Sequence, residues 1–296
     1  MFKNVLVGVD GRQGGHDAIA LARRLAAPDA TITLAHIYGS EWLLPRGVQL
    51  VASLAAEESQ GLLLTERARA GIDAHLVSGS QSSPGRGLHE ISDRHHADLL
   101  IVGSSRHALL GRALVGDDTR AALNGAPCAV AIAPRGYAQI GDELRTIGVG
   151  YDGSAQAQAA LSAARELAHR HGARIEALWV VSLQEVRDDC PIPAYWQQAT
   201  DTLIEHRRQE LGCLVGIDGD ATYGGPREEL SRLGDRVDLL IIGSRNYGPM
   251  QRLFHGTTST YLVRHLACPL LQLPRVAGAV ADRASRQPES TAVPAA

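Results

Sequence analysis

The chain has 296 residues, a length that fits two domains of ordinary size. Hydrophobic residues make up 45% and charged residues 21%, a balance that is typical of soluble globular proteins. The net charge is −3 and aromatic residues are only 4%, so the sequence has neither the basic field nor the aromatic platforms that bind nucleic acid. No apolar run has the length of a membrane span, and the N-terminal apolar stretch ends in Asp10 rather than at a signal-peptide cleavage site. We therefore expect no nucleic-acid partner and no membrane partner.

Cysteine and histidine usage argues against a metal site. The four cysteines are scattered, with no CxxC and no metal-ligand spacing, which also favours the reducing cytoplasm as location. Twelve histidines are present, but the adjacent pair His95 and His96 points in different directions on an expected helix. Cys128 and Cys268 lie 140 residues apart and are predicted to be one small buried position that occurs twice.

Two motifs occur twice at a nearly constant offset. The segment VLVGVDG at 5–11 recurs as IGVGYDG at 147–153, which is 142 residues later. The segment DLLIVGS at 98–104 recurs as DLLIIGS at 238–244, which is 140 residues later. We infer a tandem duplication. The predicted organisation is a first domain at 1–135 (copy one), a linker at 136–143, a second domain at 144–276 (copy two) and a disordered tail at 277–296.

Strands and helices are predicted to alternate in both copies. In chain order, copy one has strand 5–9, helix 15–26, strand 31–38, helix 48–70, strand 74–78, helix 87–95, strand 99–102, a further helix and strand 129–133. Copy two has strand 147–151, helix 155–171, strand 175–181, helix 195–214, strand 221–223, helix 227–233, strand 239–242, a further helix and strand 270–273. Continuous Val, Ile and Leu runs indicate parallel strands that are buried on both faces. Each copy is therefore predicted to be a five-stranded, doubly wound, Rossmann-like α/β domain.

Ligands of such sheets bind beyond the carboxyl ends of the strands, where the strand order reverses. The first strand ends in Asp10 in copy one and in Asp152 in copy two. The fourth strand ends in Gly103 or Gly243 and leads into a loop with the same spacing in both copies. These ends are the candidate ligand site.

The loop after the fourth strand has the chemistry of a phosphate cradle. In copy two it runs from Gly243 through Asn246 to Gly256, Thr257 and Ser259, with nine residues between Asn246 and Gly256. Glycines let a backbone approach a phosphate, and hydroxyls where a helix begins add donors near its positive dipole end. The alternative is that the glycines serve tight turns and that the Asp, Thr and Ser side chains only cap helices.

Copy one has the same spacing with different residues. Its loop runs from Gly103 through Arg106 to Gly116, Asp117 and Thr119. A carboxylate about 5 Å from one phosphate charge repels it by roughly 3 kcal/mol at an effective dielectric of about 20. That is on the order of a hundredfold in affinity unless Mg²⁺ or arginine side chains offset it. Copy two is therefore the better candidate for a nucleotide site.

The Asp in the first turn and the loop close to Gly-x2-Gly-x9-Gly-(Ser/Thr) resemble the universal stress protein family, in its ATP-binding branch. The two copies resemble the tandem members of that family, and the likeness covers about residues 1–275, including the endings APCAV at 126–130 and ACPL at 267–270. The resemblance implies the adenine nucleotide alpha hydrolase-like fold. Neither a Walker A motif nor GxGxxG is present, so P-loop and NAD chemistry are not indicated.

The resemblance also implies which residues would hold the nucleotide. The first-strand Asp and a backbone position after the second strand would hold the adenosine, and the loop would hold the phosphates. In copy two these residues are Asp152, Val180, Gly243, Asn246, Gly256, Thr257 and Ser259. In copy one they are Asp10, Ile37, Gly103, Gly116 and Thr119. The second glycine of the family pattern is replaced by Asn246 in copy two and by Arg106 in copy one.

The expected function is that of a cytoplasmic protein that binds ATP, with or without Mg²⁺, and regulates a stress response. No catalytic residue is predicted, and a first alternative is a weak ATPase or self-phosphorylating protein, for which His255 is the nearest candidate base. A second alternative is a nucleotide-free interaction module or carrier of an apolar ligand. The closing strands 129–133 and 270–273 are expected to pair the two copies within one chain, and a homodimer stays open.

Overall fold

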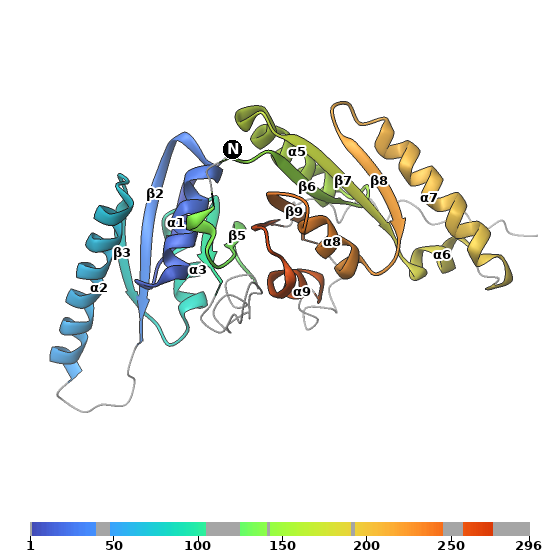
Figure 1. The fold of residues 1–296 in the computed structure, drawn as a ribbon. Coiled ribbons are helices and arrows are strands. Elements are labelled where there is room, and N and C mark those ends of the chain that lie inside the picture. The colour runs from blue at the N-terminus through green and yellow to red at the C-terminus, as the bar shows by residue number, and fades with distance from the viewer. Residues whose placement is uncertain are drawn as a thin grey trace, which may run out of the picture.

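The computed structural model describes residues 2–39, 48–104, 125–140, 143–190, 193–244 and 257–274. Figure 1 shows copy one, in blue and green, beside copy two, in yellow to red, each with helices against a central set of strands. Among the described residues, no helix combines the length and the apolar character that crossing a bilayer requires.

Copy one alternates strands and helices in the predicted order. Its elements are β1 (Phe2–Gly8), α1 (Gln13–Leu25), β2 (Ala26–Tyr38), α2 (Val48–Ala70), β3 (His75–Ser80), α3 (Pro84–Arg94), β4 (Leu99–Gly103) and β5 (Ala129–Ala133). The predicted last helix of copy one lies outside the described residues. A short 3₁₀ turn, η1 (Tyr137–Gln139), follows β5 in the predicted linker.

Copy two repeats the plan with additions around its long helix. Its elements are β6 (Thr146–Tyr151), α5 (Ala155–His171), β7 (Arg174–Val181), α6 (Leu183–Asp189), η2 (Pro193–Tyr195), α7 (Trp196–Gly212), β8 (Asp218–Tyr223), α8 (Pro226–Gly234), β9 (Leu239–Gly243), α9 (Thr257–His265) and β10 (Leu270–Leu273). The sequence did not predict α6. The helix is only seven residues long and begins where the Ser182 hydroxyl accepts the Glu185 N–H.

The ten strands of the described residues form one sheet in the order β3-β2-β1-β4-β5-β10-β9-β6-β7-β8. Within each copy the strands are parallel, and the order reverses between β1 and β4 and between β6 and β9. The two halves join where β5 and β10 run antiparallel, with Ala131 opposite Leu271. At this seam the strands of the two copies therefore point in opposite directions.

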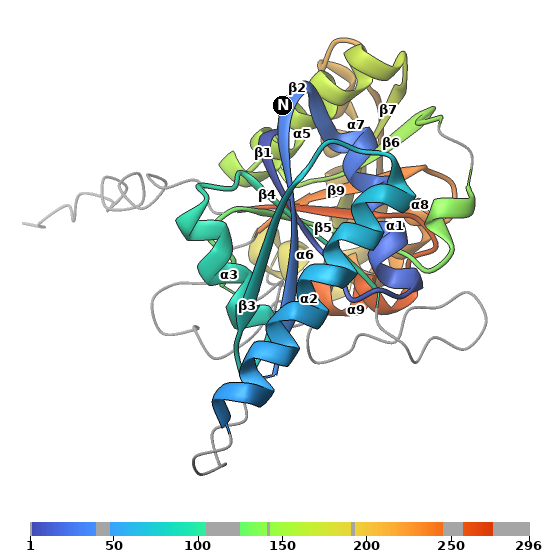
Figure 2. The ribbon, with the colours of Figure 1, turned by 90° about the vertical axis from the view of Figure 1, so that its left-hand side faces the viewer.

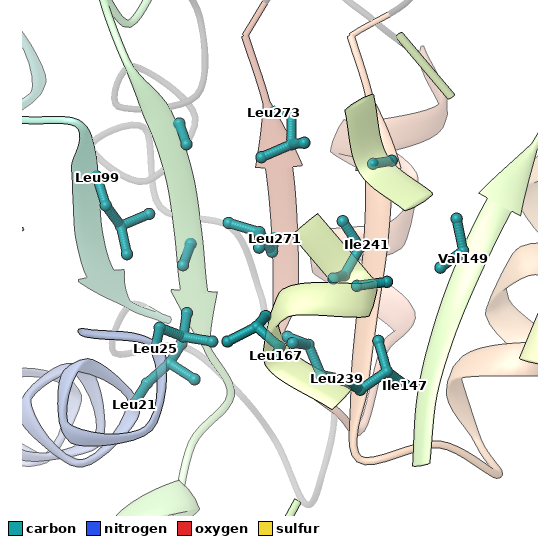
Figure 3. Close-up of a cluster of buried hydrophobic side chains, with 14 of the residues drawn as sticks. Leu21, Leu25, Leu99, Ile147, Val149, Leu167, Leu239, Ile241, Leu271 and Leu273 are labelled. Atoms are coloured by element: carbon teal, nitrogen blue, oxygen red, sulfur yellow. The ribbon is translucent and has the colours of Figure 1, made fainter. Parts of the chain in front are cut away.

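Each face of the sheet carries an apolar core that includes residues of both copies. Along β1, Val5 and Val7 face the side that α1 and α2 cover, whereas Leu6 faces the side that α3 covers. Figure 2 shows α1 and α2 on one side of the copy-one strands and α3 on the other. In Figure 3, Leu25 of α1 and Leu167 of α5 lie in one cluster that continues across the β5–β10 seam. The two copies thus share their cores as well as their sheet.

The linker is held against α1 by a buried carboxylate. Asp17 is fully buried, and its two oxygens accept the Gly136 and Ala138 N–H groups at 2.9 and 2.8 Å. The Arg24 guanidinium lies 4.2 Å from the centre of the Tyr137 ring, which is only 2% exposed. The described part of the predicted linker is thus anchored to α1 through Gly136 and Ala138.

Copy two contacts the C-terminal end of α1. His171 of α5 lies with Nε2 3.0 Å from the Arg24 carbonyl oxygen, and the Arg170 guanidinium donates to the Ala26 carbonyl. The C-terminal end of α5 therefore rests on the junction of α1 and β2. These contacts tie the two copies together on one face of the seam.

The cysteine prediction is confirmed. Cys128 precedes β5 and Cys268 precedes β10, and both are buried. Burial raises the pKa of the Cys128 thiol to about 11 and that of the Cys268 thiol to about 12. Both therefore act as small apolar side chains at neutral pH.

Replacement of Asp17 by Ala tests the anchoring of the linker. The change leaves the N–H groups of Gly136 and Ala138, whose bonds to Asp17 are partly buried, without their acceptor, so we expect the free energy of unfolding to fall by about 1–3 kcal/mol. Urea denaturation followed by circular dichroism measures it. The matched control is Asp201→Ala on the exposed side of α7, which should change stability by less than about 0.5 kcal/mol. Equal effects of the two substitutions would contradict the anchoring role.

Candidate functional site

The turn after β6 positions the copy-two carboxylate. Gly153 has a φ of +72°, and a Cβ there would lie 3.0 Å from the ring of Trp179, so this turn suits glycine. Asp152 Oδ1 accepts the backbone N–H of Ser154 at 3.2 Å and its hydroxyl at 2.5 Å. The Ser154 hydroxyl in turn accepts the Ala157 N–H at 3.1 Å and caps α5. Asp152 stays partly exposed at the end of its strand.

The matching turn of copy one is built in the same way. Gly11 has a φ of +71°, and Asp10 Oδ1 accepts the Arg12 N–H at 3.1 Å. The Arg12 guanidinium also approaches Asp10 Oδ2 to 3.5 Å, and both side chains are about half exposed. Neither aspartate is the N-cap of the helix that follows, because that position belongs to Arg12 in α1 and to Ser154 in α5. The simple helix-cap interpretation of the two aspartates is therefore wrong.

Val180 and Ile37 lie inside their strands, one residue before each strand ends. Val180 is 8% exposed and pairs with Thr222 of β8. Ile37 fills the space beside Gly87, where an added Cβ would lie 2.8 Å from the isoleucine. Both side chains belong to the core, so any ligand contact at these positions would come from the backbone.

The fourth-strand glycines have a packing role. A Cβ on Gly243 would lie 2.7 Å from backbone and side-chain atoms of Gln156, in the first turn of α5. A Cβ on Gly103 would lie 2.0 Å from the carbonyl oxygen of Gly14, in the first turn of α1. The missing side chains thus let a helix N-terminus come directly against the end of the fourth strand. The alternative that these glycines serve the fold accounts for their identity without a ligand.

The described residues bring part of the predicted site together. β6 and β9 are neighbours, with Val149 opposite Ile241, so Asp152 and Gly243 follow adjacent strands at the strand-order reversal. Thr257 begins α9, and Ser259 lies in its first turn and is partly buried. The other predicted positions, Asn246, Gly256, Gly116 and Thr119, lie outside the described residues, as do Arg106, Asp117 and His255.

An aromatic cluster beside Asp152 was not predicted. The ring centres of Tyr151 and Trp179 are 5.7 Å apart in an edge-on arrangement, and the Arg207 guanidinium lies 4.5 Å from the Trp179 ring centre. In copy one the residue that matches Trp179 in register is His36, whose Nδ1 lies 2.7 Å from the Val9 carbonyl oxygen. The sequence signal that could have found the cluster is the tryptophan itself, which stands in the apolar second half of β7.

Ser104 is a second unpredicted polar group at the copy-one strand end. Its N–H donates to the Ala133 carbonyl at 2.9 Å, and its side chain is 8% exposed. The Ser104 hydroxyl is buried and has no hydrogen-bond partner among the described residues. Ser244 of copy two makes the same backbone bond, to the Leu273 carbonyl at 3.1 Å. In both copies, the residue after the fourth strand is therefore hydrogen-bonded to the closing strand.

Comparison with known proteins identifies the fold family. The sequence model of the universal stress protein family matches residues 1–134 and 143–274. The chain belongs to the universal stress protein family. It carries two domains of that family in tandem, as the duplication predicted.

Several relatives extend over both domains. A universal stress protein of Mycobacterium tuberculosis is 23% identical over 291 residues, covering 91% of this chain and 99% of the relative. A shorter universal stress protein of Thermus aquaticus is 32% identical over 136 residues, covering 43% of this chain and 97% of the relative. The crystal structure of a universal stress protein from Archaeoglobus fulgidus superposes with a TM-score of 0.66 at 18% identity, covering 92% of this chain and 98% of that one. That structural likeness concerns the fold.

Gly243→Ala tests whether this glycine serves helix packing. The new methyl group would overlap the backbone of Gln156, so α5 or β9 must shift, and we expect a loss of about 1–3 kcal/mol in the free energy of unfolding. Gly212→Ala is the matched control, because no atom lies within 4 Å of its Cβ position and it sits in helix α7. The control should gain about 0.4–1 kcal/mol. Thermal and urea denaturation of both variants measures this, and an unchanged Gly243→Ala protein would refute the packing role.

Proposed function

We propose that this universal stress protein binds ATP at the copy-two strand-order reversal and acts in the cytoplasm as a nucleotide-responsive stress regulator. The observation that carries the proposal is the placement of Asp152 and Gly243 on adjacent strand ends. The first turn of α5 lies against Gly243, and α9 begins at Thr257 after the intervening loop. Helix N-termini favour phosphate through their free N–H groups and positive dipole end.

The residues present fit an adenine nucleotide. Asp152 is a partly exposed carboxylate that accepts hydrogen bonds, so it suits the hydroxyl or amino donors of adenosine. Val180 offers its backbone at the end of the neighbouring strand β7. Gly243, Asn246, Gly256, Thr257 and Ser259 would hold the phosphates, and a Mg²⁺ ion would offset part of their charge. Binding alone, without a catalytic residue, is sufficient for such a regulator.

Copy one is proposed to bind more weakly. Asp10 is already engaged by the Arg12 guanidinium, which competes with a ligand for the carboxylate. Asp117, at the position of Thr257, would add the charge repulsion of roughly 3 kcal/mol estimated above. The remaining positions, Ile37, Gly116 and Thr119, match the site in copy two.

The two copies are proposed to stay paired through β5 and β10 in solution. The antiparallel register of these strands and the shared apolar cores support this arrangement. Pairing of the copies covers the edge of each five-stranded sheet, which would otherwise expose unpaired N–H and C=O groups. A homodimer is not required to cover these edges.

ATP titration of three variants tests the site. Isothermal titration calorimetry of the wild type should show one dominant site, which Asp152→Ala weakens by about 10–100-fold because a charged acceptor is lost. Gly256→Asp, which puts a carboxylate into the loop, should weaken it by a similar factor. Asp10→Ala, the matched control in copy one, should leave that dominant affinity within about twofold.

Two results would refute the site assignment: no ATP binding by the wild type, or equal affinity in the wild type, Asp152→Ala and Gly256→Asp proteins. Circular dichroism of each variant guards against loss of fold. Mass spectrometry of the protein purified without added nucleotide gives an independent readout, because a tight site carries its ligand through purification.

A further inference from the structure

The first copy contains a cavity of about 430 Å³ on the side of its sheet that α3 covers. Its lining includes Asn4 and Leu6 of β1, Thr33 of β2 and Val77 of β3. Asn4 lies near the start of β1, whereas Asp10 follows the end of that strand. The cavity therefore lies toward the start of the copy-one strands, away from Asp10, and it belongs to copy one, whereas the proposed nucleotide site belongs to copy two.

The cavity lies beyond the C-terminal end of α3. Leu88 of α3 covers Gly8, at the far end of β1, but the helix ends at Arg94. His96 then adopts a φ of +50° and turns the chain into β4, where the Asp98 N–H donates to the Asn4 carbonyl at 2.9 Å. The parts of β1, β2 and β3 around Asn4, Thr31 and His75 thus lie beyond the end of the helix. His95 and Ala97 form the side wall of the space that remains.

Copy two fills the same place with its own ion pairs. In register, Thr31 and Thr33 of β2 correspond to Arg174 and Glu176 of β7, since each pair faces matching residues of the first strand. The Arg174 guanidinium approaches Glu176 to 3.6 Å, and Arg236 approaches Glu176 to 3.1 Å.

Arg174 also donates to the Thr146 hydroxyl at 3.0 Å. His75 of copy one likewise corresponds to Asp218 of copy two. In copy two, charged side chains that pair with one another thus occupy the place that is a cavity in copy one.

We propose that this cavity binds a small, neutral, flat molecule with a hydroxyl or amide group, of the phenol or aromatic amide type. Thr31, Thr33 and Asn4 supply hydroxyl and amide groups, and Leu6 and Val77 supply an apolar floor on the flat sheet. No Lys, Arg, Asp or Glu is among the described residues that line it, so a charged ligand would lose its hydration without a partner.

The exposed imidazoles of His75 and His95 lie at the edge of the cavity, where they offer ring faces and one hydrogen bond each. The volume falls at the small end of the range of roughly 300–1,000 Å³ found for ligand pockets, which suits one ring rather than a nucleotide. The cavity ligand is thus chemically distinct from ATP.

Chemical-shift titration of the ¹⁵N-labelled full chain with phenol and benzamide tests the proposal, with benzoate as the charged probe of the same size. We expect saturable shifts at the backbone amides of Thr33, His75, Val77 and His95. Benzoate should bind at least tenfold more weakly than benzamide.

The double substitution Thr31→Arg with Thr33→Glu transplants the copy-two residues into the cavity, and should weaken benzamide at least tenfold. Ala97→Val introduces the residue that copy two has at the matching position. It is a milder variant that still tests the proposal if the double variant does not fold. It should weaken benzamide severalfold. Arg174→Thr with Glu176→Thr is the control in copy two and should leave the shifts in copy one unchanged.

Three outcomes would overturn the proposal. They are the absence of saturable shifts at these amides, benzoate binding as tight as benzamide, or full binding by a folded double variant. Added ATP should not displace benzamide, since the cavity lies in copy one and the proposed ATP site in copy two. Failure of ATP binding would therefore leave this inference intact.

Discussion

The antiparallel pairing of β5 with β10 is the interaction on which the rest of the molecule depends. It joins two five-stranded parallel sheets into one sheet of ten strands and lets a single apolar core extend over each face. Without it, each copy would expose a buried-type strand of alanine, valine and leucine at an open edge. The linker reinforces the pairing, because Asp17 fixes the chain immediately after β5 through two backbone N–H groups.

The two copies share one fold but differ in the side chains that surround the ends of their strands. The first-strand turn is the same in both copies, down to the positive φ of Gly11 and Gly153. The surroundings differ, since copy two places Trp179 where copy one has His36, and fills with ion pairs the face that copy one leaves hollow. Selection for the shared architecture constrains the strands and the turns, whereas side chains at the ends of the strands are free to specialise. These differences are the basis of the two proposed ligand sites, one in each copy.

The sequence predicted the strand and helix order well because buried parallel strands leave continuous Val, Ile and Leu runs between Asp and Gly. The family was recognised from the Asp in the first turn and the spacing of the glycine loop, and both are local enough to be read from the sequence. It could not assign the role of Gly243, because the contact with Gln156 joins residues 87 positions apart. Nor could it find the anchor between Asp17 and the linker, whose partners are 119 and 121 residues away. The cavity depends on cross-strand register and on where α3 stops, and neither can be read from periodicity.

Cross-strand disulfide formation tests the central pairing most directly. In one protein Ala131 and Leu271 are replaced by Cys, in a second Val130 and Gln272, with the native cysteines replaced by Ala in both. Neighbouring pairs in an antiparallel ladder alternate between a hydrogen-bonded and a non-hydrogen-bonded geometry, which differ in the distance between Cα atoms. The two proteins sample both geometries, so at least one should form a disulfide within a single chain under mild oxidation. A control with Ala131 and Leu273 replaced, which is out of register, should crosslink much more slowly. An intrachain crosslink at a registered pair is the predicted result, and crosslinks that form only between chains, or not at all, would contradict the paired arrangement.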